Sequence, residues 1–411
     1  MMRIRSLLRI LFAVIGVTIA ASLTMPSKLT PIREYEPASQ GSSQPRSVVM
    51  QPRVRLTGHK RSVYALAFSP DGHILATGGE ENAARLWDAA TGQTKEELYA
   101  GFQVHGLTFS PDGRMVAMWS YGARIPLWNT GTGELKAVLT EPKGFVRSVA
   151  FSPDSHSVAT ASMDGLSAHL WEAETGGLRA TLDHPNPYRY ANGVAYGHAD
   201  GVDKVAFSPD GKTLVTTSER IIYLWDVATA RMRMKLIDPD VRISTPTWRS
   251  LKGFSHGDTI YDLAISPDGR TIATASRDGT AKLWDLATGN LKAILQHEGK
   301  VLHVTFSHDS KTLATGSEDR TAHLWNVSLG KLIATLPHKG TVHTLSFSAD
   351  SALIATASDN EKWANIWRVA TGELLTQLPD ARPPVVFSPI GRTLATASRG
   401  SDVLLWDVPN N

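Results

Sequence analysis

Short apolar stretches separated by turn residues run through most of the chain after residue 53. The segment from Ile260 to Gln296 shows this pattern clearly. Its stretches IYDLAIS, TIATAS, TAKLWD and LKAILQ are separated by PDG at 267–269, RDG at 277–279 and ATG at 287–289. β-Branched and aromatic residues favour strands, whereas Pro, Asp and Gly favour turns. The segment is therefore predicted to form four short strands.

The same unit recurs eight times. FSPDG stands at 68–72, 109–113 and 207–211, with variants beginning at 151, 265, 306, 347 and 387. The positions five and two residues before this motif are apolar in seven units, so both faces of the first strand are apolar. A sheet buried on both faces needs a neighbour on each side, which units arranged radially around an axis supply. Each unit ends at a tryptophan: Trp87, Trp128, Trp171, Trp225, Trp284, Trp325, Trp367 and Trp406.

These repeats, the Gly-His pairs at 58–59 and 197–198 and the Trp-Asp pairs at 87–88, 225–226, 284–285 and 406–407 resemble the WD-repeat family of β-propellers. The resemblance covers about residues 54–411 and implies an all-β, eight-bladed propeller, which we expect to be bacterial. In that family, each unit supplies the outer strand of one blade and three strands of the next. The last unit stops after a third strand, so we expect Arg53–Thr57 to close the ring. The propeller is predicted at residues 53–411.

The N-terminal segment has the pattern of an export signal. Arg3, Arg5 and Arg9 precede an apolar run from Ile10 to Ala21, so residues 1–25 are predicted to be a signal peptide or a signal anchor. Residues 26–52 are rich in Pro, Ser and Gln and are expected to be a flexible linker. Both alternatives place the propeller outside the cytoplasm, either periplasmic or secreted, or anchored to the inner membrane by residues 7–25.

Charge and composition narrow the function. The formal net charge of +3 arises in the first 53 residues, because the remainder has 35 basic and 37 acidic residues. A nucleic-acid partner is therefore not expected. The chain has no cysteine, which excludes disulfides, thiol nucleophiles and Cys-ligated metals. It also lacks the dinucleotide, P-loop, zinc-protease and nucleophile-elbow motifs, so no cofactor, metal or catalytic residue is assigned.

The resemblance also assigns several polar residues to structure. In the family, a histidine before the first strand belongs to a buried hydrogen-bonded tetrad with Ser, Asp and Trp. His59, His198, His256, His297 and His338 occupy this position, whereas three units carry Ala100, Pro142 and Leu378 there. Buried polar groups need partners, which favours a structural role over catalysis. Two units match the whole tetrad: His256, Ser276, Asp278 and Trp284, and His297, Ser317, Asp319 and Trp325.

Two long insertions interrupt the repeat, at residues 183–201 and 238–258. By the family geometry, both loops emerge on one face. Aromatic and arginine side chains are enriched at protein-binding hot spots, so this pair of loops is the first candidate partner-binding surface. The alternative is that their aromatic residues pack on one another to keep the loops compact. The candidate residues are Tyr188, Arg189, Tyr190, Tyr196, Arg242, Trp248, Arg249 and Phe254.

The second candidate surface surrounds the central opening. In the family, side chains at the start of the innermost strands line that opening, and here their charge and shape differ from unit to unit. Such variation is typical of a surface free to specialise, although it is also expected from neutral drift on a solvated rim. The candidates are Tyr64, His105, Arg147, Tyr261 and His343, with Arg277 at a neighbouring turn.

These observations predict a non-enzymatic, monomeric scaffold outside the cytoplasm that binds a protein or peptide on its loop-rich face. Membrane contact is expected only through the N-terminal segment. Fold alone does not decide function. The alternative is a propeller enzyme or small-ligand binder with an acid/base or metal cluster at the central opening. That cluster would contain His105, His343, Asp203, Arg147 and Tyr261.

Overall fold

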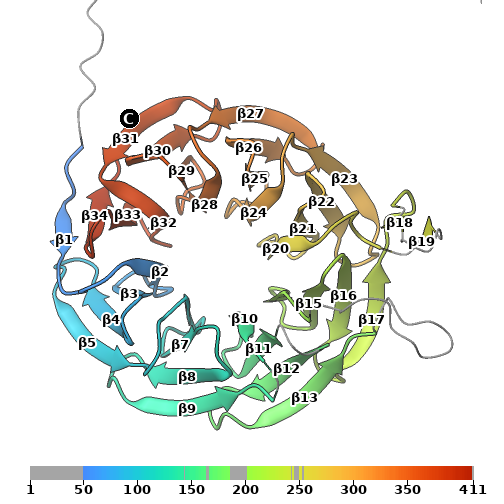
Figure 1. Cartoon of the computed structure of the whole chain (residues 1–411), viewed down its shortest axis with the longest axis horizontal. Coiled ribbons are helices and arrows are strands. Elements are labelled where there is room, and N and C mark those ends of the chain that lie inside the picture. The colour runs from blue at the N-terminus through green and yellow to red at the C-terminus, as the bar shows by residue number, and fades with distance from the viewer. Residues whose placement is uncertain are drawn as a thin grey trace, which may run out of the picture. The chain divides into compact units, whose positions relative to one another are not determined.

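The computed structural model describes residues 50–142, 144–162, 166–185, 201–241, 243–244, 250–251 and 254–409. These residues form eight four-stranded antiparallel sheets and one two-stranded sheet. Figure 1 shows the four-stranded sheets, called blades below, arranged in a ring with one strand of each toward the centre and one at the perimeter. The prediction of an all-β, eight-bladed propeller is confirmed.

The first four blades follow one another along the chain, from the innermost strand outward. Blade 1 contains β2 (Val63–Phe68), β3 (Ile74–Gly79), β4 (Ala83–Asp88) and β5 (Thr94–Tyr99). Blade 2 contains β6 (Gly106–Phe109), β7 (Met115–Trp119), β8 (Arg124–Asn129) and β9 (Leu135–Thr140). Blade 3 contains β10 (Val146–Phe151), β11 (Ser157–Ser162), β12 (Ser167–Glu172) and β13 (Leu178–Asp183). Blade 4 contains β14 (Lys204–Phe207), β15 (Thr213–Ser218), β16 (Ile221–Asp226) and β17 (Arg231–Leu236).

The remaining blades keep this order, except that the last takes its outer strand from the N-terminal side. The two-stranded sheet, β18 (Ile243–Ser244) and β19 (Ser250–Leu251), comes between blades 4 and 5 in sequence. Blade 5 contains β20 (Ile260–Ile265), β21 (Thr271–Ser276), β22 (Thr280–Asp285) and β23 (Leu291–Gln296). Blade 6 contains β24 (Val301–Phe306), β25 (Thr312–Ser317), β26 (Thr321–Asn326) and β27 (Lys331–Pro337). Blade 7 contains β28 (Val342–Phe347), β29 (Leu353–Ser358), β30 (Trp363–Arg368) and β31 (Leu374–Pro379), and blade 8 contains β32 (Ala381–Phe387), β33 (Thr393–Ser398), β34 (Val403–Asp407) and β1 (Val54–Leu56).

The hydrophobic core lies between neighbouring blades. The second strands are the most buried, and all six residues of β21 are buried. Their small and β-branched side chains suit strands that are covered on both faces. Between blades 5 and 6, Leu283 and Leu295 pack in one cluster with Val301, Phe306 and Trp325. A blade therefore completes its core only against its neighbour, as the two-sided apolar pattern predicts.

The turns after the innermost strands also join neighbouring blades. Gly269 has a φ of +70°, a conformation that glycine adopts without steric cost. Ser310 occupies the same turn position in blade 6 with a φ of +61°, and its hydroxyl accepts a hydrogen bond of 3.0 Å from the backbone N–H of Asp268 in blade 5. Serine at this position therefore adds a hydrogen bond between blades.

The strand β1 completes blade 8. It pairs antiparallel with β34, with Val54 opposite Leu405 and Leu56 opposite Val403. The backbone N–H of Arg53 donates to the Leu405 carbonyl at 2.7 Å. Leu56 is buried in the cluster that joins blade 8 to blade 1. The segment expected to supply the fourth strand thus occupies that position.

A buried hydrogen-bonded relay recurs in several blades, and blade 5 shows it in full. The indole N–H of Trp284 donates to the Thr274 hydroxyl at 3.2 Å, and that oxygen lies 2.7 Å from His256 Nε2. His256 Nδ1 lies 3.0 Å from the Asp278 carboxylate. The carboxylate can only accept, so Nδ1 carries a proton and Nε2 accepts from the threonine. The relay therefore fits a neutral histidine, and burial lowers the pKa of His256.

The assignment of Ser276 to this tetrad was wrong, because the hydroxyl belongs to Thr274. Ser276 instead donates to the backbone carbonyls of Asp258 and Thr259, at 3.1 and 3.0 Å. Strand register explains the difference, because Ile272 lies opposite Trp284 and only Thr274, two residues further on the same face, reaches the indole N–H. The same holds in blade 6, where the hydroxyl belongs to a threonine rather than to the assigned serine. That relay contains His297, Asp319, Thr315 and Trp325, without Ser317.

Blade 4 corrects a second assignment. His184, not His198, lies 2.6 Å from the Thr216 hydroxyl, which accepts from Trp225 at 2.9 Å. His184 directly follows β13, as other relay histidines follow their outer strands. The insertion in this unit comes after the histidine, so counting back from the inner strand selected the wrong residue. His198 itself lies outside the described residues.

Blades 2 and 3 lack the relay histidine, and each replaces it in a different way. In blade 3, the buried Glu141 carboxylate bonds the Thr160 hydroxyl, which accepts from Trp171 at 2.8 Å. In blade 2, Val116 lies opposite Trp128, so the buried Met118 occupies the position that Thr274 has in blade 5. Within the described ranges, the buried indole nitrogen of Trp128 has no hydrogen-bond partner. Blade 2 therefore depends on packing, as expected for a unit without the histidine.

Candidate functional site

A cavity of about 410 Å³ opens where the inner strands of blades 2 to 5 begin, and we call it the inner-strand cavity. Its volume lies within the range of about 300–1,000 Å³ that is usual for ligand sites. Aromatic rings and charged groups share its wall. The ring-bearing lining residues are His105, Trp119, Tyr121 and Tyr261, and the charged ones are Arg147, Asp203 and Lys204.

Three rings form a cluster at the edge of this cavity. The His105 ring stacks on Tyr64 of blade 1 with centroids 5.5 Å apart, and it lies 4.5 Å from the Tyr121 ring. Burial lowers the pKa of His105, which favours the neutral imidazole. Tyr64 and Tyr121 are 43% and 64% exposed. This aromatic cluster of Tyr64, His105 and Tyr121 is therefore available to a partner.

Arg147 and Asp203 form an ion pair across blades 3 and 4. Arg147 Nη1 lies 2.5 Å from Asp203 Oδ1, and the backbone N–H of Glu219 donates to Oδ2 at 3.1 Å. Burial raises the pKa of Asp203 to about 6, although Arg147 and the Glu219 N–H act in the opposite direction. The carboxylate is almost wholly buried in the cavity wall, where it holds Arg147 in position.

Trp119 is a cavity residue that the sequence interpretation missed. It pairs in register with Gly106, and a Cβ atom at Gly106 would lie 2.1 Å from the indole Cε2. The missing side chain makes room for the indole. The signal was present in the repeat, because the other seven units have small residues at this register position: Gly78, Ala161, Thr217, Ala275, Gly316, Ala357 and Ala397.

The inserted loops are only partly described. Seven of their candidates, Tyr188, Arg189, Tyr190, Tyr196, Arg242, Trp248 and Arg249, lie outside the described residues. The eighth, Phe254, was wrongly assigned to the binding surface. It is 2% exposed, packs in the core cluster between blades 3 and 4, and lies 6.0 Å from Lys235 Nζ. Its ring belongs to the core and is not available to a partner.

The candidates around the central opening divide into two groups. His105, Arg147 and Tyr261 line the inner-strand cavity together with Asp203. His343 instead pairs with Asp359 in blade 7 at 2.7 Å, and Arg277 lies 3.9 Å from Asp258. The five-residue catalytic cluster is therefore not assembled as a unit, because four of its members line the inner-strand cavity and His343 does not.

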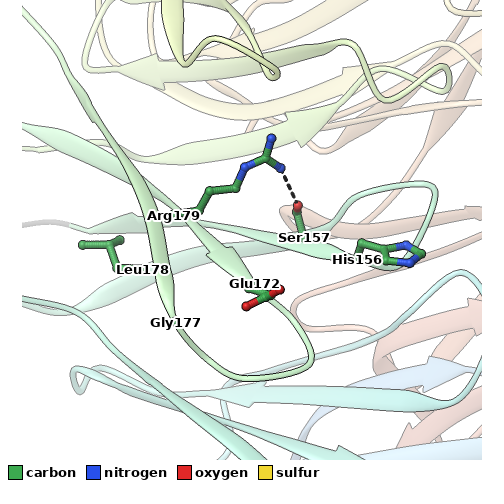
Figure 2. A pocket seen from close by; sticks show the side chains of 6 residues that line it. All are labelled: His156, Ser157, Glu172, Gly177, Leu178 and Arg179. Carbon is green, nitrogen blue, oxygen red and sulfur yellow. Dashed lines mark hydrogen bonds between the residues drawn. The ribbon is translucent and has the colours of Figure 1, made fainter.

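A second pocket, of about 380 Å³, lies on blade 3 between His156, Ser157, Glu172 and Arg179 (Figure 2). Arg179 Nη1 donates to the Ser157 hydroxyl at 3.2 Å, whereas His156 Nδ1 donates to the Asp154 carbonyl at 2.6 Å. Figure 2 shows the imidazole turned away from Ser157. This serine and histidine therefore do not form the hydrogen-bonded pair of an activated nucleophile.

The described part of the chain was compared with the requirements of a metal site and of a membrane-spanning helix. No three His, Asp or Glu side chains there come together in a way that could hold a metal ion. The same residues include no helix of sufficient length and apolar character to span a membrane.

Several proteins are similar to this chain. The protein tipD of Dictyostelium discoideum is 26% identical over 253 residues, which are 61% of this chain and 30% of tipD. Eukaryotic translation initiation factor 3 subunit I of Candida albicans is 24% identical over 60% of this chain and 54% of its own length. The guanine nucleotide-binding protein subunit beta of Zea mays is 23% identical over 59% and 60%. The chain thus spans less than two thirds of these relatives. All three are eukaryotic, so bacterial origin stays a prediction.

The comparisons also include a solved structure and a family model. The crystal structure of the computationally designed Ika8 protein matches with a TM-score of 0.67 and 22% identity, over 87% of this chain and all of the designed one. That likeness concerns the fold alone. The model of the WD domain, G-beta repeat matches residues 50–88, 133–166, 192–226, 248–285, 289–326 and 330–363, more than half of the chain. The chain belongs to the WD domain, G-beta repeat family.

Proposed function

We propose that this protein is a non-enzymatic scaffold that binds a protein or peptide over the inner-strand cavity and the aromatic cluster. The exposed rings of Tyr64 and Tyr121 on either side of His105 carry the proposal. Rigid aromatic side chains beside a cavity are typical of binding hot spots. Two of the relatives support the proposal, because their names describe them as subunits of larger proteins.

The alternative is a small-ligand or catalytic site inside the cavity. The raised pKa of Asp203 favours it, since perturbed carboxylates are common in active sites. However, both carboxylate oxygens of Asp203 already have partners, and the side chain is buried. The aromatic cluster also extends beyond the cavity wall to Tyr64, further than a ligand held within the cavity needs. A protein-binding function therefore explains more of these residues than a small-ligand or catalytic site does.

Replacing Tyr121 or Tyr64 by alanine is expected to weaken partner binding by about 2 kcal/mol, roughly 30-fold in Kd, because each ring is a contact surface. The measurement is quantitative affinity purification from the native host, followed by Kd determination with the captured protein. Tyr99→Ala, at an exposed tyrosine on the outer strand β5, is the matched control. If all three variants capture the same proteins with equal Kd, the aromatic cluster is not the binding surface.

The inserted loops remain a proposed part of the partner-binding surface. Their aromatic and arginine content supports this role for the residues outside the described ranges. The absence of a basic excess after residue 53 supports a protein partner rather than a nucleic acid. We also propose that the scaffold acts as a monomer.

Export is the remaining part of the proposal. Arginines before an apolar run support a signal peptide or an anchor in residues 1–25, which would place the propeller in the periplasm or outside the cell. Fractionation of the native host is expected to recover the protein outside the cytoplasm, and N-terminal sequencing to find either cleavage near residue 22 or an intact membrane-bound chain. A full-length product in the cytosolic fraction would contradict export.

A further inference from the structure

At the inner-strand cavity, the positively charged side chains are more exposed than the carboxylates with which they pair. Arg147 and Lys204 are 35% and 33% exposed, whereas their carboxylate partners Asp203 and Asp262 are 5% and 17% exposed. A molecule that enters the cavity therefore meets the two cations before it meets either anion. Because Coulomb attraction weakens with distance and is less screened away from bulk water, the cavity favours an anionic group.

The carboxylates of comparable ion pairs elsewhere around the ring are more exposed than Asp203 and Asp262. In blade 6, Lys300 pairs with Glu318, and in blade 7, His343 pairs with Asp359. In both pairs the acid is at least as exposed as the base. An entering anion would be repelled by these acids as strongly as it is attracted by their partners. In blade 1, Arg61 is more exposed than Glu80, but this carboxylate is itself 32% exposed. Exposed cations over well-buried carboxylates are therefore a feature of blades 3 to 5.

The buried acids also hold the cations in position. Asp262 Oδ1 lies 3.1 Å from Lys204 Nζ, and Oδ2 accepts from the Val304 N–H at 3.2 Å and lies 3.5 Å from His303. Asp203 is likewise bonded at both oxygens. Within the described residues, Arg147 donates only through Nη1, which leaves other guanidinium donors for a ligand. Such preorganised donors bind carboxylates without first losing side-chain entropy.

We propose that the inner-strand cavity binds a carboxylate of an acidic segment of the partner protein, through Arg147 and Lys204, with an adjacent apolar side chain packed on Trp119 and Tyr121. This inference rests on the proposed scaffold function. The carboxylate belongs to an internal Asp or Glu or to the C-terminus of the partner chain. A peptide fits better than a small acid, because the aromatic cluster continues outside the cavity to Tyr64.

Selection from a random dodecapeptide library tests the proposal, using the full chain as bait and two display formats. One format presents internal segments, and the other presents free C-termini. We expect selected peptides to carry Asp or Glu next to an aromatic or aliphatic residue in the first format, or to bind only with a free C-terminus in the second. Selection of peptides without an acidic side chain in the first format, together with binding that does not need a free C-terminus in the second, would overturn the proposal.

Variants then assign the binding to the cavity. Arg147→Gln and Lys204→Gln are each expected to weaken a selected peptide at least tenfold, whereas Lys300→Gln, at an ion-paired lysine of similar exposure, leaves Kd unchanged. The double variant Arg147→Gln with Asp203→Asn removes both charges without leaving a buried carboxylate unpaired, so it separates lost binding from lost folding. It should bind as weakly as Arg147→Gln. Unchanged Kd in a folded double variant contradicts the proposal.

The same peptides distinguish this inference from the scaffold function on which it rests. Peptides that lose affinity with Tyr121→Ala but not with Arg147→Gln would refute carboxylate recognition and leave the scaffold function intact. Peptides that bind independently of both residues, or a library without binders, would count against both. With wild-type protein, Kd of an acidic peptide should also rise as salt increases from 50 to 500 mM, since exposed charges are screened.

Discussion

Deleting residues 1–58 is expected to destabilise the propeller by several kcal/mol, whereas deleting residues 1–52 should have little effect. The longer deletion removes β1, its backbone hydrogen bonds to β34 and the buried side chain of Leu56. Loss of a buried leucine side chain typically costs about 2–5 kcal/mol, and each hydrogen bond contributes about 1 kcal/mol more. The exposed edge of β34 would also invite aggregation. Denaturant unfolding of both truncated chains measures the difference.

Point variants of the full chain separate packing from the effects of truncation. Leu56→Ala should lower the unfolding free energy by about 3 kcal/mol, because it opens a cavity between blades 8 and 1. Arg55→Ala should cost less than about 1 kcal/mol, since the Arg55 side chain is exposed and its ion pair with Asp402 is solvated. Equal unfolding midpoints for the two truncated chains would show that β1 does not close the ring.

The fold could be predicted from sequence because the signals repeat. The tryptophans and the FSPDG-type turns mark each blade, and eight independent copies average out local exceptions. The relay was predicted less accurately, because spacing alone does not show which hydroxyl lies next to the indole. Thr274 and Ser276 lie on the same face of β21, and only the register with Trp284 decides between them. Insertions also mislead spacing arguments. Counting back from the inner strand of blade 4 selects His198, whereas the relay histidine is His184.

The candidate site was predicted in part. Looking at the start of each inner strand identified His105, Arg147 and Tyr261, because one register position places them around the opening. That approach could not find Trp119, which comes from a second strand and reaches the cavity because Gly106 lacks a side chain. The layering of cations over acids also depends on contacts between blades, which a single sequence does not specify. The sequence therefore identified part of the candidate site, whereas the contacts among its residues could be read only from the structure.

Acidification from pH 7 to pH 4 is expected to destabilise the propeller strongly. Burial lowers the pKa of His59, His184, His256 and His297, and for His184 the pKa falls to about 4. In the unfolded chain these groups titrate near 6.5. Below that pH the unfolded state binds more protons than the folded state, so unfolding becomes easier as pH falls. His184 alone should contribute about 3 kcal/mol of this loss by pH 4.

Denaturant unfolding measured from pH 7.5 to pH 4.5 should give constant stability above pH 7 and a steepening loss below pH 6.5. Asp203 acts in the opposite direction, because its pKa is raised to about 6, but it is one group against several histidines, which also include His323, whose pKa burial lowers to about 4. His184→Gln should make the loss shallower by up to about 1.4 kcal/mol per pH unit, despite a lower stability at pH 7. His156→Gln, at an exposed histidine, is the matched control and should keep the wild-type slope. Stability that stays constant down to pH 5 would mean that the relay histidines titrate at the same pH in the folded and unfolded states, whereas stability that rises as pH falls below 7.5 would mean that they are already charged in the folded protein, with Nε2 donating to threonine.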